Sequence, residues 1–200
     1  MRKIAFAALI AGITVMASPS AQADGDPEKG KVLAYTCLGC HGIDGYRNAY
    51  PSYRVPRLGG QHAEYLVAAL QAYKNDSRKH ATMNAQAKTL SDLDMADLAA
   101  FFSGYNTVDA GVAVVEKPGK AKATGCAGCH GANGVSPAAM YPTIAGQQAE
   151  YIVHSLEQYR SGERQNPFMS GMAAPLSDAD IAELAEFFAA QPGLKTTTAE

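Results

Sequence analysis

The pattern C-x-x-C-H occurs twice in this chain of 200 residues, at positions 37–41 and 126–130, and the two copies use all four cysteines. Two thiols at this spacing can each form a thioether to one edge of a porphyrin, and the histidine that follows can place its imidazole against the iron. The duplicated pattern therefore predicts two covalently bound haem c groups. The predicted thioether anchors are Cys37, Cys40, Cys126 and Cys129. The predicted first axial ligands are His41 and His130.

Four cysteines also admit a disulfide framework, a zinc site or a thioredoxin-like redox pair. A disulfide framework does not require a histidine after each pair of cysteines. A zinc site would join the two pairs into one cluster, although they lie 89 residues apart in the chain. A thioredoxin-like pair needs only one motif, in a βαβ context that this sequence does not suggest. The duplicated motif therefore favours haem attachment.

The beginning of the chain has the pattern of a secretory signal peptide. Two cations precede an apolar run at residues 4–16, and the small-residue sequence Ala21-Gln22-Ala23 follows it. The apolar run is short for a membrane span. We expect residues 1–23 to be a cleaved signal peptide, and the mature chain to lie in an exported compartment such as the bacterial periplasm. Thiol chemistry and covalent haem attachment are compatible there.

The mature part of the sequence repeats itself once, at an offset of 86 residues. Pro56-Arg57-Leu58-Gly59-Gly60-Gln61 recurs as Pro142-Thr143-Ile144-Ala145-Gly146-Gln147, and Phe101-Phe102 recurs as Phe187-Phe188. Such a repeat predicts two similar structural units rather than one large domain. The expected division is an N-terminal domain over residues 24–105, a linker over 106–117 and a C-terminal domain over 118–200.

Each unit is predicted to be mostly helical. A short helix is expected to enter the C-x-x-C-H segment, and a loop, a middle helix and a terminal helix to follow it. Ser91 and Ser177 stand where the N-caps of the terminal helices belong, and each has an aspartate three residues later. Strand signals are sparse. The expected fold class is therefore all-α, with two tandem domains that each enclose one haem.

The second axial ligand of each iron decides between electron transfer and small-molecule chemistry. Met83 and Met169 are related by the repeat offset, and they are the predicted second ligands. Met172 and His80 are competitors, but each is replaced by a different residue type in the other copy. They are therefore expected to be neighbours of the two sites rather than ligands. A carbonyl near each of the two repeat prolines, Pro56 and Pro142, is expected to accept the imidazole N–H of the motif histidine.

The distribution of charge limits the classes of partner. Residues 24–105 carry nine cations and nine anions, whereas residues 106–200 carry six cations and ten anions. Nucleic-acid binding is not expected without a basic surplus. Arg47, Arg54 and Arg57 cluster in the first unit, and the sequence leaves open whether they pair with haem propionates, steer an acidic partner or lie in solvent.

With these motifs in view, the two units resemble class I cytochrome c domains, and their tandem order resembles the dihaem cytochrome c4 family. The resemblance rests on both C-x-x-C-H motifs, on the Leu-Ser-Asp starts of the terminal helices and on two longer matches in the second unit. These are Tyr141-Pro142-Thr143-Ile144-Ala145-Gly146-Gln147 and Arg164-Gln165-Asn166-Pro167-Phe168-Met169. The first unit departs at Val55, where the second has a tyrosine, and its loop at 46–57 is three residues longer.

This resemblance implies an electron carrier and not an enzyme. Two haems with histidine and methionine ligands would lie close across the interface and relay single electrons from an upstream donor toward a membrane-bound terminal oxidase. The alternative is the electron-accepting cytochrome subunit of a periplasmic dehydrogenase, such as a flavin-containing sulfide dehydrogenase. Peripheral association with a membrane is left open.

Overall fold

The structure is a computed structural model that describes residues 25–106 and 108–198. The expected signal peptide at residues 1–23 lies outside the described residues. The described part of the chain is helical and contains no strand, only two isolated bridges. Its helices are α1 (Pro27–Leu33), α2 (Tyr35–His41), α3 (Ala63–Lys74), α4 (Ala81–Lys88), α5 (Asp92–Gly104), α6 (Lys120–Ala123), α7 (Ala127–His130), α8 (Ala149–Ser161), α9 (Pro167–Ala173) and α10 (Asp178–Ala189).

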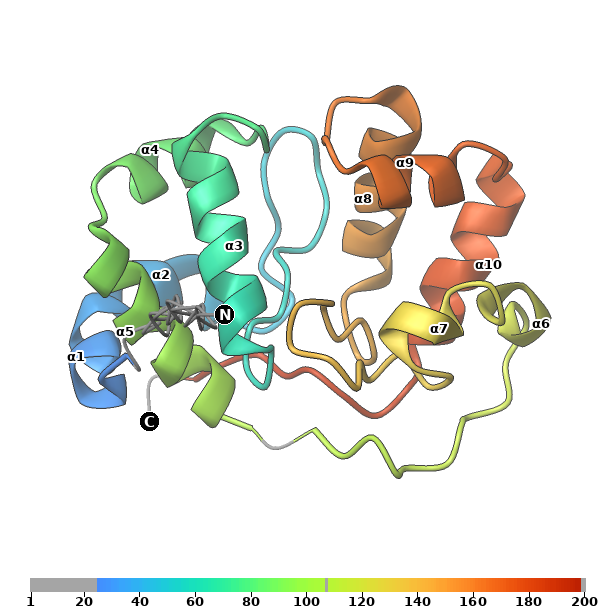
Figure 1. The fold of residues 1–200 in the computed structure, drawn as a ribbon, viewed down its shortest axis with the longest axis horizontal. Coiled ribbons are helices and arrows are strands. Elements are labelled where there is room, and N and C mark those ends of the chain that lie inside the picture. Colours follow the sequence, from blue (N-terminus) through green and yellow to red (C-terminus); the bar gives the residue numbers. More distant parts are fainter. Residues whose placement is uncertain (1–24, 107, 199–200) are drawn as a thin grey trace, which may run out of the picture.

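These helices form two lobes that lie side by side (Figure 1). In the first lobe α5 packs against α1 and α3, and α3 packs against α4. In the second lobe α10 packs against α6 and α8, and α8 packs against α9. The expected all-α fold with two tandem units is confirmed.

The terminal helix of each lobe supplies most of its core. Ser91 caps α5 and Ser177 caps α10, and both form the complete capping box that the sequence predicts. Each serine accepts the backbone N–H of the aspartate three residues later, which satisfies a donor that the helix itself leaves free. Beyond these caps, Leu98 and Phe102 in α5 and Phe187 in α10 are buried.

We expect replacement of Ser177 by alanine to lower the free energy of unfolding by about 1 kcal/mol, because the N-terminal donors of α10 lose their side-chain acceptor. Denaturant titration of the holoprotein, followed by far-ultraviolet dichroism, measures this change. Ser177→Thr is the matched control, since threonine also accepts at an N-cap. A Ser177→Thr variant as unstable as Ser177→Ala would contradict a capping role.

The described residues of the expected linker, 106 and 108–117, contain no helix. They run below the second lobe toward α6 (Figure 1). The side-chain amide of Gln191 accepts the backbone N–H of Val115 at 2.8 Å and donates to its carbonyl at 3.0 Å.

Beyond α10 the chain passes under both lobes and returns to the first lobe (Figure 1). There Lys195 and Gly59 exchange two backbone hydrogen bonds of 3.1 Å each. The end of the chain therefore ties the second lobe to the first, a contact that the repeat does not predict.

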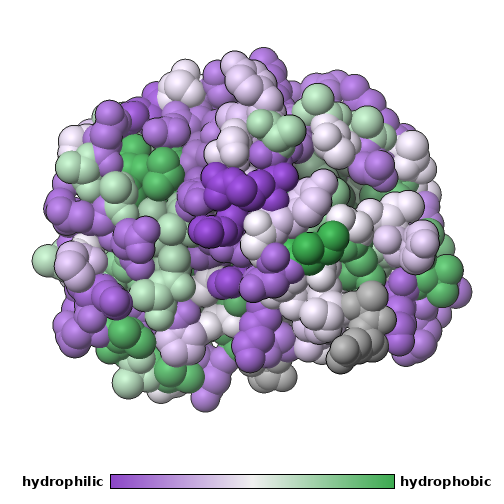
Figure 2. Space-filling model, turned by 180° about the vertical axis from the view of Figure 1, so that it is seen from behind, coloured by the Kyte–Doolittle hydropathy of each residue, from purple (hydrophilic) through white to green (hydrophobic). Residues whose placement is uncertain are grey.

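The surface of the described residues is mixed in character. Figure 2 shows the face opposite to that of Figure 1, where hydrophobic residues lie in small separate groups and strongly hydrophilic residues gather near the centre. Within the described residues, no helix combines the length and the apolar character that crossing a bilayer requires.

Candidate functional site

The first C-x-x-C-H motif lies on α2 and ends it. The helix carries Cys37 and Cys40 on neighbouring turns and places His41 at its last position, where the side chain is 9% exposed. The Nδ1 atom of His41 lies 2.8 Å from the carbonyl oxygen of Pro56. A carbonyl can only accept, so Nδ1 carries the proton and the lone pair of Nε2 is left for a metal. No described residue forms a hydrogen bond with this Nε2 atom.

The second motif repeats this geometry on α7. His130 ends the helix and is 8% exposed, and its Nδ1 atom lies 2.8 Å from the carbonyl oxygen of Pro142. The expectation that each repeat proline carbonyl accepts an imidazole N–H is confirmed in both lobes. Such a hydrogen bond fixes the ring orientation and makes the imidazole more basic, as the binding of iron by a histidine requires.

The ionisation of the motif side chains follows from their burial. Burial lowers the pKa of His41 and of His130, which keeps both rings neutral and able to donate a lone pair. Burial raises the pKa of the Cys37 thiol and of the Cys126 thiol. A redox-active cysteine pair needs the opposite shift, because the thiolate is the nucleophile. These environments disfavour the thioredoxin-like alternative.

The two candidate methionine ligands lie on short helices that the sequence did not predict. Met83 lies in the first turn of α4 and Met169 in the first turn of α9, and both are partly buried. His80 caps α4, with its Nδ1 atom accepting the Met83 backbone N–H at 3.3 Å. Asn166 caps α9 in the same way, with its Oδ1 atom accepting the Met169 N–H at 3.1 Å. His80, the competing ligand in the first lobe, therefore acts as the N-cap of α4. The ligation of iron by the two methionines stays a prediction.

A cluster of arginine and tyrosine side chains lies between the lobes, and the sequence analysis missed it. Arg78 of the first lobe donates to the hydroxyl of Tyr151 in the second. Arg164 of the second lobe donates in turn to the hydroxyl of Tyr65 in the first, at 3.0 Å. Both pairs are related by the offset of 86 residues, so the repeat held a signal that could have revealed them.

Both arginines of this cluster are buried, at 7% and 8% exposed, and neither forms an ion pair with a described carboxylate. Each guanidinium lies over a tyrosine of its own lobe, Arg78 over Tyr73 at 4.4 Å and Arg164 over Tyr159 at 4.5 Å. Burial alone would raise the pKa of Tyr151, but the two arginines lower it to about 8. Two buried cations without an acidic partner make this region complementary to the carboxylates of a cofactor.

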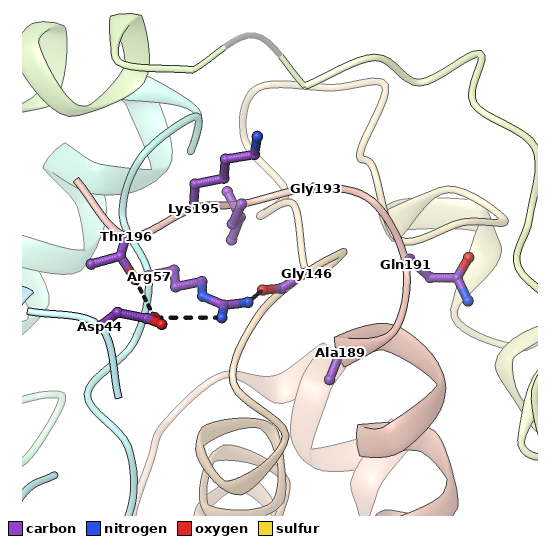
Figure 3. Close-up of a pocket in the computed structure, with 9 residues that line it drawn as sticks. Asp44, Arg57, Gly146, Ala189, Gln191, Gly193, Lys195 and Thr196 are labelled. Atoms are coloured by element: carbon purple, nitrogen blue, oxygen red, sulfur yellow. Dashed lines mark hydrogen bonds and ion pairs between the residues drawn. The ribbon is translucent and has the colours of Figure 1, made fainter. Parts of the chain in front are cut away.

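The arginine-rich loop of the first lobe also contacts the second lobe. Arg47 and Arg54 form ion pairs with Glu150 at 2.9 and 3.2 Å. Figure 3 shows Arg57 between Asp44 and Gly146: it lies 3.7 Å from the carboxylate and donates to the Gly146 carbonyl at 2.6 Å. Asp44, Arg57 and Gly146 border an open hollow of about 390 Å³ at the boundary between the lobes. The three arginines therefore hold the lobes together, a role that the sequence analysis did not consider.

The alternative uses of the cysteines find little support in the geometry. None of the four cysteines is paired in a disulfide. Among residues 25–106 and 108–198, no group of three or more His, Cys, Asp or Glu side chains is placed to bind a metal ion. A zinc site joining the two motifs is therefore not formed within the described chain.

Comparison with known proteins identifies the family. The family model "Cytochrome c" matches twice, over residues 27–104 and 116–191. Cytochrome c4 of Stutzerimonas stutzeri is 36% identical, and the match covers 94% of this chain and 98% of that protein. The crystal structure of reduced recombinant cytochrome c4 from Pseudomonas stutzeri superposes with a TM-score of 0.70 at 32% identity, covering 86% of this chain and 100% of that one.

A further relative has a name that refers to an enzyme partner. The "thiosulfate dehydrogenase electron acceptor" of Thiomonas intermedia (strain K12) is 29% identical, and the match covers 100% of this chain and 95% of that protein. Two tandem cytochrome c domains, each with its own attachment motif, account for all these similarities. The chain belongs to the dihaem cytochrome c4 family of electron-transfer proteins and carries two covalently bound haem c groups.

Proposed function

We propose that this protein relays single electrons in the periplasm through two haems with histidine and methionine ligands. The thioether anchors are Cys37 and Cys40 in the first lobe, and Cys126 and Cys129 in the second. His41 with Met83, and His130 with Met169, would be the pairs of iron ligands. One observation carries this proposal: each lobe holds a buried, neutral histidine whose Nε2 atom is free and whose Nδ1 atom is fixed by a proline carbonyl.

The protein's own groups then determine how such a carrier works. When bound, each haem would supply an iron that can alternate between Fe(II) and Fe(III). The Pro56 and Pro142 carbonyls keep the proton on Nδ1 of each histidine and fix the orientation of the ring. A methionine thioether as the second ligand would favour the ferrous state and leave no position for small molecules. Arg78 supplies buried positive charge for haem propionates, as does its counterpart in the other lobe.

Binding of carbon monoxide tests the proposal that both irons are closed. Fully reduced protein at neutral pH is expected to bind no carbon monoxide, because a six-coordinate iron has no position for it. The Soret spectrum before and after addition of the gas measures binding, and a protein unfolded in denaturant with its haems attached is the positive control. Rapid stoichiometric binding to the native protein would point to an open-iron catalyst.

We propose two classes of electron-transfer partner. The first proposal is that electrons pass onward to a membrane-bound terminal oxidase. The second is that the protein accepts electrons from a periplasmic dehydrogenase, and the similarity to a thiosulfate dehydrogenase electron acceptor favours a sulfur-oxidising enzyme.

Stopped-flow mixing distinguishes these partners. Reduced protein is mixed with oxidase-containing membranes and oxygen, and oxidised protein is mixed with thiosulfate dehydrogenase and thiosulfate. Rapid reoxidation in the first mixture supports the oxidase as acceptor. Rapid reduction in the second mixture, absent without thiosulfate, supports the dehydrogenase as donor.

A further inference from the structure

The two lobes exchange a second set of contacts, in which a buried glutamine of each lobe binds the backbone of the other. The amide of Gln147 accepts the backbone N–H of Arg57 at 2.8 Å and donates to the Arg57 carbonyl at 3.0 Å. The amide of Gln61 accepts the N–H of Thr143 at 2.9 Å and donates to the Thr143 carbonyl at 2.8 Å. Gln147 is 5% exposed and Gln61 is 4% exposed, so both side chains are largely shielded from water.

The peptide groups that these glutamines bind are the same ones that hold the motif histidines. The carbonyl of Pro56 and the N–H of Arg57 belong to a single peptide unit. Its oxygen accepts from His41 Nδ1 at 2.8 Å, and its N–H donates to Gln147 Oε1 at the same distance. A continuous hydrogen-bonded chain therefore runs from the histidine of the first lobe to the glutamine of the second.

An equivalent series of hydrogen bonds runs from the histidine of the second lobe to the glutamine of the first. The Pro142 carbonyl accepts from His130 Nδ1 at 2.8 Å, and the N–H of Thr143 in the same peptide unit donates to Gln61 Oε1 at 2.9 Å. A further hydrogen bond fixes the orientation of each glutamine amide. The N–H of the following residue donates to each Oε1 atom, from His62 at 3.0 Å and from Gln148 at 2.9 Å. The amide orientations are therefore determined by donors that cannot be reversed.

We infer that each lobe sets the reduction potential of the haem in the other lobe. Gln147 is the positioning residue for His41. Gln61 is the positioning residue for His130. This inference rests on the proposed function, in which these histidines are the axial ligands.

The direction of the effect follows from the polarity of the chain. An acceptor at the peptide N–H makes the carbonyl of the same peptide unit a stronger acceptor, because hydrogen bonds in a series polarise one another. A stronger bond at Nδ1 makes the imidazole a more basic ligand, which stabilises Fe(III). Removal of the glutamine amide is therefore expected to raise the potential of the haem in the opposite lobe.

The test needs the potential of one haem at a time, and the methionine assignments allow this. In a Met169→Ala background only the first haem keeps a thioether ligand, so the weak red absorption band of the ferric thioether-ligated form reports that haem alone. Adding Gln147→Leu to this background is expected to increase the equilibrium constant for reduction of the first haem roughly tenfold, or about 59 mV for one electron. In a Met83→Ala background, Gln61→Leu is expected to have the same effect on the second haem.

Two comparisons separate this effect from general damage to the interface. Gln148 is 8% exposed and neighbours Gln147, but its side chain forms no hydrogen bond with a described residue. Gln148→Leu is therefore expected to leave the potential of the first haem unchanged. Gln147→Asn keeps an amide but shortens the side chain by one methylene, and it serves where the leucine variant does not fold. It is expected to raise the potential in the same direction.

The outcomes show separately whether this inference fails and whether the proposed function fails. Loss of the red band already in the Met169→Ala background would refute the assignment of Met83, and with it the proposed function. A band that persists but titrates at an unchanged potential in Gln147→Leu would overturn the inference alone. An equal shift in Gln148→Leu, or a shift confined to the haem of the lobe that carries the mutation, would also overturn it.

Discussion

A Met83→Ala variant is expected to carry one open and one closed iron. The thioether is the axial ligand that raises the potential of a haem of this kind, and alanine supplies no replacement. The midpoint potential of the first haem should fall by something on the order of 0.2 V, a modest part of the range that axial ligands span. The reduced variant should bind one carbon monoxide per molecule. Potentiometric titration and gas titration measure these two effects.

The helix that carries this methionine should survive the substitution. His80 caps α4 by accepting the backbone N–H of residue 83, a group that alanine retains. Alanine is also the best helix former, so the change is expected to remove the proposed iron ligand without unfolding α4. The effect of Met83→Ala is therefore expected to be local to the ligand position.

Substitutions in α9 provide the matched control. Met169→Ala is expected to produce the same changes at the second haem, since Met169 occupies the same position after its N-cap. Met172 lies three residues further on the same helix and is 46% exposed. Met172→Ala should leave both potentials and the red absorption band unchanged. Persistence of both ferric thioether bands in Met83→Ala, or loss of one band in Met172→Ala, would refute the ligand assignment.

The parts of the fold and site that were predictable from the sequence depend on few and neighbouring residues. The C-x-x-C-H spacing needs only one turn of helix to bring its side chains together. The capping boxes at Ser91 and Ser177 are closed within four residues of chain. The repeat doubled each of these signals. Local chemistry of this kind is readable because no distant contact is required to complete it.

The short helices that carry the methionines were missed for a physical reason. The segment 81–88 has little amphipathic pattern, and its N-cap is a histidine, which is not among the preferred capping residues. The segment 167–173 did contain a usable signal, because Asn166 and Pro167 are favoured at the N-cap and the first helical position. At seven residues it is too short for a periodicity argument.

The polar interface could not be derived from pattern alone. Buried side chains such as Gln61, Arg78 and their counterparts look like surface residues in a sequence, because burial of a polar group depends on partners from the other lobe. The return of residues 191–198 to Gly59 is equally non-local. These contacts required the three-dimensional arrangement, although the repeat offset marked several of their members.

The protein without covalent haem is expected to lose its tertiary structure. The buried apolar cluster of the first lobe consists of five residues, of which two are alanines, and that of the second consists of six. Cores of this size are small for lobes of about eighty residues, and an enclosed macrocycle adds a large apolar body to each. The two buried arginines would also lose the propionates that we propose offset their charge, which adds the cost of unpaired buried cations.

Serine substitution of the motif cysteines tests this dependence one lobe at a time. With all four replaced and free haem extracted, near-ultraviolet dichroism and dispersion of the amide proton spectrum should collapse. With only Cys37 and Cys40 replaced, signals of the first lobe should collapse while Phe187 and its neighbours stay ordered, because the buried residues of each apolar cluster come from one lobe only. A native-like near-ultraviolet spectrum for the fourfold variant would show that the polypeptide alone specifies the packed state. Collapse of both lobes in the double variant would instead mean that the interface, including the Gln61 and Gln147 contacts, makes the two lobes a single cooperative unit.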